Sequence, residues 1–218
     1  MTPRECAAEA VRSFARGVSA VHVHPRDAEG RESLEPGAVA ATVSAIRAAC
    51  PELPVGVSTR EPIEPDLARR LEAIRGWTVR PDFASVNVHE PGAEAVAEVL
   101  HEQGVGVEAG IWTADAARAW RAWRVPSRRV LLECMEESEE AALANARAML
   151  EEIGPSTVAE RPPLLHGEGL ATWVVLREAV ALGLDTRIGL EDTLVLPDGS
   201  PAADNAAMVA AAVALGAG

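Results

Sequence analysis

The sequence contains no lysine and no tyrosine. All 20 basic residues are arginines, and aromatic residues make up only 3% of the 218 positions. Lysine is required for Schiff-base chemistry and for phosphate binding in a P-loop, and tyrosine is a common general acid. Mechanisms that depend on these groups are therefore excluded. If the protein activates a carbonyl group, a metal ion is the main electrophile left.

Positive charge is scarce overall. The formal net charge is -13 and the isoelectric point is near 4.8. Because nucleic acids and anionic membranes attract arginine and lysine, we expect neither as a partner. The sequence shows no apolar run of 18 residues and no signal peptide, so we expect a cytoplasmic protein.

The three cysteines are few, odd in number and far apart. Cys6, Cys50 and Cys134 fit reduced thiols in a cytosol better than a disulfide framework or a thiolate zinc site. We expect them to act as small buried hydrophobic residues.

Apolar residues make up 48% of the chain, enough to bury a full core, and the length fits one domain over residues 1–218. Short apolar runs alternate with longer segments of helical periodicity. The predicted strands cover 18–23, 54–58, 82–87, 105–108, 128–133, 162–166 and 185–190. The predicted helices cover 3–16, 36–49, 64–75, 91–103, 113–124, 138–153, 168–182 and 202–215. Seven such units with parallel strands favour a TIM-type (β/α) barrel over an open sheet.

Polar side chains gather where the predicted strands end. These positions are His22 and His24, Ser58 and Thr59, Asn87 and His89, Glu108, Glu133, His166, and Glu191 with Asp192. Barrel enzymes carry their chemistry at the C-terminal ends of the strands, so we expect these side chains on one rim. Glu191 and Asp192 have an alternative role as the N-cap and first-turn acid of the last helix, and Glu108 could instead pair with an arginine.

The stretch SAVHVHPRDAEGR, residues 19–31, places two histidines one residue apart. Alternate side chains of an extended chain point the same way, so His22 and His24 share a face and can hold one ion. This pair predicts a metal site that needs a third ligand. We expect the turn at Arg26 and Asp27 to brace the site.

Two motifs resemble those of the β-keto acid cleavage enzymes. They are AVHVHPRDAEGR, residues 20–31, and DTRIGLEDTLVLPDGSPAADNAAMV, residues 185–209, with further matches at VGVSTREP, PDFASVNV and VGVEAGIWT. The resemblance covers nearly the whole chain. It implies a (β/α) barrel that binds one divalent ion, usually zinc, through His22, His24 and Glu191.

The resemblance also implies a reaction. The family joins a β-keto acid to acetyl-CoA and releases acetoacetate and a new CoA thioester. Asp192 matches its general base and Arg187 the residue that orients the base. The candidate substrate-binding positions are Ser58, Thr59, Ser85, Asn87 and Glu108.

General chemistry supports these roles. A β-keto acid chelates a cation through its carboxylate and keto oxygens, which makes the carbon between them acidic. Asp192 could remove that proton, with Arg187 keeping the carboxylate ionised. Ser85 and Asn87, on one face of the third strand, could donate to the developing oxyanion.

The sequence departs from the family's pattern in three places. The family begins with an additional strand, whereas only Met1 and Thr2 precede the first predicted helix, so we expect an opening in the barrel beside His22. Arg60 and Glu61 stand where the family tends to have glycines, which predicts a substrate of different size or charge. The third departure is Thr193, where the family often has asparagine.

An open barrel edge needs a cover, either the first helix or another subunit. Trp112, Trp120 and Trp123 fall nearly on one face of the predicted helix 113–124, and the last helix is rich in alanine. We therefore expect a homo-oligomer, a dimer or tetramer. Two other functions stay open: a metal-dependent barrel hydrolase or isomerase that needs no CoA, and a barrel homologue that has lost activity.

Overall fold

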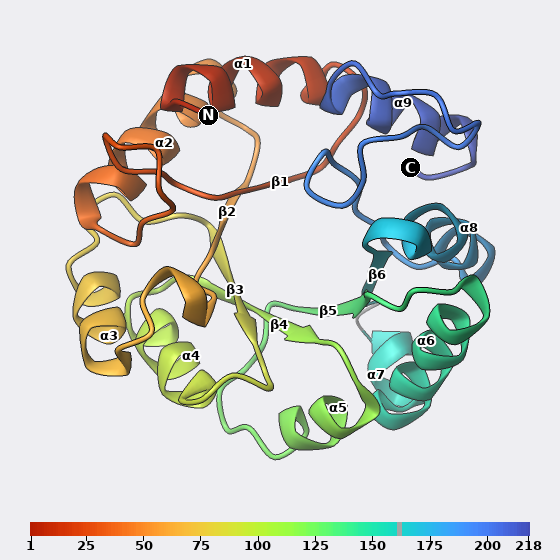
Figure 1. Ribbon diagram of the computed structural model, residues 1–218. Helices are drawn as coiled ribbons and strands as arrows, with labels where there is room; N and C mark the ends of the chain where they lie inside the picture. The colour runs from red at the N-terminus through yellow and green to blue at the C-terminus, as the bar shows by residue number, and fades with distance from the viewer. Residues whose placement is uncertain (161–162) are drawn as a thin grey trace. The chain divides into compact units, whose positions relative to one another are not determined.

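The computed structural model describes residues 1–160 and 163–218. They form an α/β fold (Figure 1). The chain divides into two compact units. The first unit comprises Met1–Ala109 and Trp123–Arg128, and the second comprises Gly110–Ala122 and Arg129–Gly218. A single domain over the whole chain stays a prediction.

The first unit alternates helices and strands, as the sequence pattern predicts. Its elements are α1 (Pro3–Phe14), β1 (Val21–Val23), α2 (Pro36–Ala49), β2 (Val55–Ser58), the 3-10 helix η1 (Glu61–Ile63), α3 (Leu67–Arg75), β3 (Phe83–Asn87) and α4 (Ala93–Glu102). Strand β4 (Gly106–Ile111) begins in this unit and ends in the second. Strands β1 to β4 are neighbours in chain order, and β1 pairs with β2, and β2 with β3, in parallel.

The core of the first unit lies between these strands and helices. All four residues of β2 are buried, as is typical of a parallel strand covered on both faces. The Phe83 ring of β3 packs directly over Gly56, where an added Cβ would lie 2.1 Å from the ring. Helix α1 packs against α2 and contributes Cys6 and Ala10 to the core. This packing holds β1 and the turn after it in place.

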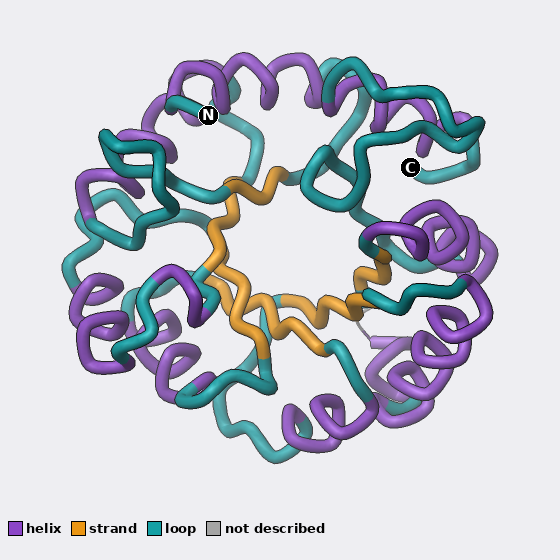
Figure 2. The backbone as a smooth tube through the Cα atoms, in the orientation of Figure 1, coloured by secondary structure: helices purple, strands orange, loops and turns teal. Residues whose placement is uncertain are grey.

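The second unit continues the alternation. Its elements are α5 (Ala114–Trp120), β5 (Arg129–Cys134), α6 (Glu139–Ile153), α7 (Pro155–Glu160), β6 (Leu164–Gly167), the 3-10 helix η2 (Gly169–Ala171), α8 (Thr172–Leu182) and α9 (Asn205–Ala214). Strands β5 and β6 pair in parallel, with Glu133 opposite His166. Figure 2 shows the strands in orange and the helices that follow them in purple.

Seven strands are predicted, and the described residues contain six. Pro162, in the predicted strand 162–166, lies outside the described residues. The predicted strand 185–190 does not form, although the Leu165 N–H donates to the Asp185 carbonyl at 2.9 Å. Beyond that contact the Leu190 N–H binds the Asn205 side chain instead of a neighbouring strand. The chain then turns back as the Asp192 N–H donates to the Gly189 carbonyl.

The predicted helix 113–124 is shorter than expected. Helix α5 starts after its N-cap Thr113 and ends at Trp120, while Trp123 packs against the core of the first unit. Trp112 precedes the N-cap. The three tryptophans therefore do not form one helix face, and this prediction is wrong.

Two simpler expectations can be compared directly with the structure. All three cysteines are free and buried, as the sequence analysis expects. Among the described residues, no helix has both the length and the apolar character needed to cross a membrane.

Candidate functional site

His22 and His24 stand at the C-terminal end of β1 in the first unit. His22 lies within the strand and His24 one residue beyond it, and both side chains are half-buried. Their Nε2 atoms lie 3.2 Å apart. The alternation of an extended chain brings the two rings together, as the H-x-H spacing predicts.

The hydrogen bonds of Ser85 determine how His22 carries its proton. The Ser85 hydroxyl donates its only proton to Glu108 at 2.6 Å and lies 3.2 Å from His22 Nδ1. The hydroxyl oxygen must therefore accept from the Nδ1–H of His22. This tautomer leaves the Nε2 lone pair of His22 available for a metal ion.

Glu32 acts on His24 in the same way. One Glu32 oxygen lies 3.0 Å from His24 Nδ1 and also accepts from Arg60 at 2.7 Å. Burial raises the pKa of the Glu32 carboxyl. The neighbouring His24 and Arg60 lower it by more than burial raises it, so the pKa falls below its ordinary value. The contact is an ion pair without hydrogen-bond alignment, and the ionised carboxylate beside Nδ1 favours a proton on that nitrogen, which keeps the Nε2 lone pair of His24 for a ligand role.

The two Nε2 atoms fit a shared zinc ion. Nitrogen ligands at about 2.0–2.1 Å from a tetrahedral zinc are separated from each other by about 3.3 Å. The separation of 3.2 Å agrees with this value. An oxygen atom also lies within 3.2 Å of Nδ1 in both rings, as is usual for metal-binding histidines.

The turn after β1 braces the site differently from what we expected. Asp27 binds Arg31 and the backbone of its own turn, and Arg26 donates to the Gly30 carbonyl. The residue of this turn that reaches a histidine is Glu32, placed by an antiparallel bridge with Arg26. Sequence reasoning missed Glu32 because its contact depends on the path of the turn, which no spacing rule encodes.

The other candidates of the first unit lie at the ends of the next strands. Thr59 is buried and its hydroxyl donates to the Ser85 carbonyl at 2.7 Å, while Ser58, also buried, accepts from the Arg60 N–H. Asn87 donates to Glu90 at 2.9 Å. Glu108 accepts from the Ser85 hydroxyl at 2.6 Å, and the alternative of an arginine partner stays open.

The remaining candidates, Arg187, Glu191 and Asp192, belong to the second unit, where Arg187 contacts both acids. Its Nη2 atom lies 3.1 Å from Asp192 Oδ1 and 3.5 Å from Glu191 Oε2. Asp192 is buried, whereas the Glu191 side chain is 47% exposed. Asp204 caps α9, so the alternative role of Glu191 and Asp192 as capping acids of the last helix is wrong.

His166 and Glu133 extend this network. The buried His166 ring has Nδ1 at 3.4 Å from Asp192 Oδ1 and Nε2 at 3.6 Å from Glu133 Oε2. Both residues stand at predicted strand ends, but no sequence pattern assigns them a role. Their cross-strand pairing in β5 and β6 is the feature that brings them together.

The charges of this network shift one another's ionisation. Burial raises the pKa of the Asp192 carboxyl, but Arg187 and His166 outweigh it and the net pKa falls. Burial and Arg187 lower the pKa of His166, but the carboxylates of Asp192 and Glu133 raise it to a net value above the ordinary one. The pKa of Glu133 falls because His166 and Arg187 overcome the effect of burial. Asp192 is therefore ionised at neutral pH, as a general base must be.

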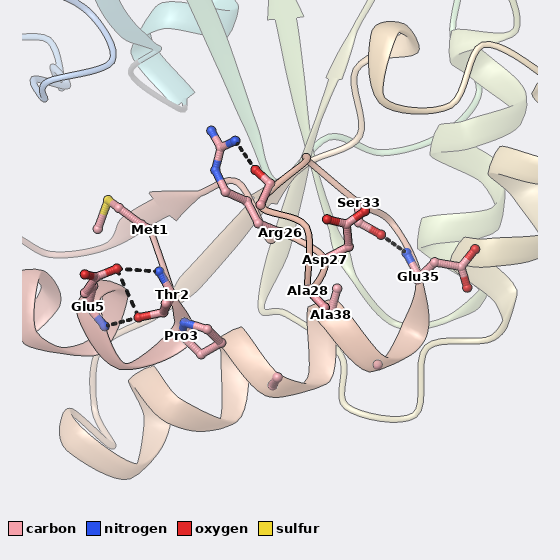
Figure 3. A pocket seen from close by; sticks show the side chains of 13 residues that line it. Met1, Thr2, Pro3, Glu5, Arg26, Asp27, Ala28, Ser33, Glu35 and Ala38 are labelled. Carbon is pink, nitrogen blue, oxygen red and sulfur yellow. Dashed lines mark hydrogen bonds between the residues drawn. The ribbon is translucent and has the colours of Figure 1, made fainter.

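A separate pocket of about 590 Å³ opens in the first unit. Figure 3 shows it between the start of α1, with Thr2 and Glu5, the turn at Arg26 and Asp27, and the start of α2 at Ala38. None of the site residues predicted above lines it. The Glu5 carboxylate binds Thr2 in the capping box of α1.

A comparison with protein families decides the classification. The family model described as beta-keto acid cleavage enzyme matches residues 1–217. The chain belongs to this family. The resemblance carried by the two motifs is thereby confirmed, and His22, His24, Arg187, Glu191 and Asp192 all fall within the match.

Solved structures provide a second comparison for this β-keto acid cleavage enzyme family member. The apo structure of ObcA matches with a TM-score of 0.73 and 18% sequence identity, covering 96% of this chain and 60% of that chain. The binary complex of ObcA with oxaloacetate matches with a TM-score of 0.72 and 17% identity, covering 96% and 62%. At these identities the likeness shows a shared fold. The chain spans about three fifths of the length of these structures.

Proposed function

We propose that this chain cleaves a β-keto acid in a metal-dependent reaction with acetyl-CoA. The bond between C2 and C3 of the keto acid breaks, and C2 forms a new bond to the acetyl carbon. The CoA sulfur moves from the acetyl group to the acyl group left behind. The products are acetoacetate and a new CoA thioester, so atoms and electrons balance. Family membership and the pair of oriented histidines support this proposal most strongly.

We propose that His22, His24 and Glu191 hold one divalent ion, and that this ion is zinc. The support is the N···N distance of 3.2 Å, the two fixed Nδ1–H tautomers and the match of Glu191 to the family's third ligand. Two nitrogens and one carboxylate leave a coordination position open for substrate oxygens. Such an ion would polarise the keto and carboxylate oxygens and acidify the carbon between them.

Asp192 is the proposed general base and Arg187 its orienting partner. The carboxylate of Asp192 is buried, paired with a guanidinium at 3.1 Å and held ionised. A base of this kind removes the C2 proton once the substrate lies within hydrogen-bond reach.

The substrate contacts are proposed for five residues of the first unit: Ser58, Thr59, Ser85, Asn87 and Glu108. The Ser85 hydroxyl and Glu108 also orient His22, so they link the substrate site to the ligand pair. Oxaloacetate, which ObcA binds, has a keto group β to one of its carboxylates. A small keto acid of this class is accordingly the proposed substrate.

Three further features belong to the same proposal: a (β/α) barrel fold, a bound acetyl-CoA and a homo-oligomer. The alternation of strands and helices from β1 to β6 with parallel pairing supports the barrel. The CoA site rests on family membership alone.

A coupled assay tests the proposal. Purified protein is first analysed for metal content and then incubated with a panel of β-keto acids, with and without acetyl-CoA. We expect close to one equivalent of zinc and acetoacetate formation only when acetyl-CoA is present. His22→Ala should abolish both metal binding and turnover, with His101→Ala as the control on an exposed helix position. Acetoacetate formation without a thioester, or turnover in metal-free protein, would rule the proposal out.

A further inference from the structure

His166 is a buried histidine clamped between two carboxylates. Its side chain is 1% exposed, and the two ring nitrogens face different acids, Asp192 at Nδ1 and Glu133 at Nε2. Glu133 and His166 are direct neighbours across β5 and β6. The ring orientation is therefore set by the strand register and by the charge on each side.

Stability alone gives little reason for such a network. Burying charged groups carries a large desolvation cost, and apolar residues of similar volume often stabilise a core equally well. Glu133, His166, Asp192 and Arg187 nevertheless form one continuous chain in the interior of the second unit. Ionisable groups retained at such a cost are typical of functional sites.

The contacts of Asp192 are unevenly divided between its two oxygens. Arg187 Nη2 and His166 Nδ1 both approach Oδ1, at 3.1 and 3.4 Å. Across the described part of the chain, the structure assigns no hydrogen-bond donor to Oδ2. Two groups thus approach one oxygen position, and a partial rotation of the carboxylate would weaken both contacts.

We propose that His166 and Glu133 are positioning residues that fix Asp192 so that Oδ2 takes the proton from the substrate. This inference rests on the proposed function only in taking Asp192 as the base. The two contacts are ion pairs, at 3.6 Å between Glu133 and Nε2 and 3.4 Å between Asp192 Oδ1 and Nδ1, without the alignment of hydrogen bonds, so charge attraction on both sides sets the ring between the two acids. The clamp is a feature of this chain's own Glu133 and His166, outside the residues that the family motif supplies.

Two substitutions separate the two contacts of the imidazole. An asparagine at position 166 can place its amide nitrogen near the position of Nδ1, and a glutamine near that of Nε2. His166→Asn therefore keeps a donor for Asp192, while His166→Gln keeps the contact to Glu133 only. We expect His166→Gln to lower kcat by about 10-fold or more, less than the about 10²- to 10⁴-fold loss of the base itself, with KM nearly unchanged. His166→Asn should retain the higher kcat of the two.

Controls separate positioning from folding. His101→Gln changes an exposed histidine and should leave kcat at the wild-type value. Zinc content and the unfolding midpoint of each variant are measured alongside. Equal kcat losses in His166→Asn and His166→Gln, or a loss confined to KM, would overturn the positioning role.

A measurement on the resting protein keeps the inference independent of turnover. In protein with ¹⁵N-labelled histidine, we expect Asp192→Asn to shift the Nδ1 resonance of His166 more than the Nε2 resonance. Glu133→Gln should do the opposite. If wild-type protein cleaves no β-keto acid, the proposed function fails, while this spectrum still decides whether the clamp exists. If the Nδ1 resonance of His166 is the same in wild type and Asp192→Asn, the contact between His166 and Asp192 does not exist.

Discussion

Glu32 lies 3.0 Å from His24 Nδ1 and ties the turn after β1 to the proposed metal ligand. Arg60 donates two hydrogen bonds to the same Glu32 oxygen. Arg60 is one of the expected departures from the family pattern, and its two hydrogen bonds connect it through Glu32 to the ligand pair.

Glu32→Gln should weaken zinc binding. The amide cannot accept from Nδ1–H as strongly as a carboxylate, so His24 loses basicity and a fixed orientation. Changes at such partners typically lower metal affinity by about 10- to 100-fold. Competition with a chromophoric chelator gives the affinity. Glu29→Gln, an exposed residue of the same turn, is the matched control, and equal affinities for the two variants would contradict the prediction.

Ser85→Ala should destabilise the protein more than Ser58→Ala. The first variant removes the donor to the buried Glu108 and the acceptor for His22, so two polar groups in the interior each lose one hydrogen bond. Such a loss costs about 1–3 kcal/mol. Ser58 is equally buried but only accepts a long hydrogen bond of 3.4 Å from Arg60. Urea denaturation gives both free energies of unfolding, and a Ser58→Ala loss that equals the Ser85→Ala loss would refute the assignment.

Two glycines should respond in opposite directions to alanine. At Gly56 an added Cβ would lie 2.1 Å from the Phe83 ring, whereas at Gly37 in helix α2 nothing lies within 4 Å. Overpacking a core costs about 1–3 kcal/mol, and removing glycine freedom at a compatible helix position gains about 0.4–1 kcal/mol. Thermal unfolding should show Gly56→Ala below the wild type and Gly37→Ala at or above it. A wild-type midpoint for Gly56→Ala would mean that β2 and β3 are not packed as described.

The network around His166 predicts a pH window for stability. The folded pKa of His166 lies above its ordinary 6.5, so its contribution is complete below pH 6.5 and is lost as pH rises through the folded pKa. The folded pKa of Glu133 lies below its ordinary 4.5, so its contribution is complete above pH 4.5 and is lost as pH falls through the folded pKa. The difference in unfolding free energy between wild type and His166→Asn should be largest between pH 4.5 and 6.5. A difference that stays constant from pH 4 to 9 would exclude the ion pairs.

Local patterns predicted the strands and helices well where the elements bury continuous apolar runs. The run around Val55 and Val57 forms β2, and the two strand-end histidines meet because extended chains alternate. The predicted strand 185–190 does not form, for a reason that the hydrophobic pattern does not contain. The Gly189 carbonyl accepts from the Asp192 N–H in a turn, and the Leu190 N–H donates to the side chain of Asn205, which lies 15 positions later in the chain.

The site was predicted where residue types and motif spacing specify it, and missed where it depends on tertiary packing. Arg187 and Asp192 lie five residues apart and pair as expected. Glu133 and His166 are 33 positions apart, and only the register of β5 and β6 brings them together. Single-sequence patterns contain no information about such cross-strand neighbours.

The expected homo-oligomer stays a prediction. Its support comes from exposed apolar residues of the second unit, because the tryptophans do not form one helix face. Helix α9 buries Met208 and Ala212 in the core of that unit, yet Val213 is 49% exposed. Exposed apolar positions on a helix favour packing between subunits. Light scattering at micromolar concentration should give a dimer or tetramer of the 22.9 kDa chain. Val213→Arg should shift the distribution toward the single chain, while Val11→Arg, 43% exposed on α1, should not. A mass of one chain for the wild type would refute the prediction, and equal effects of both variants would place the interface elsewhere.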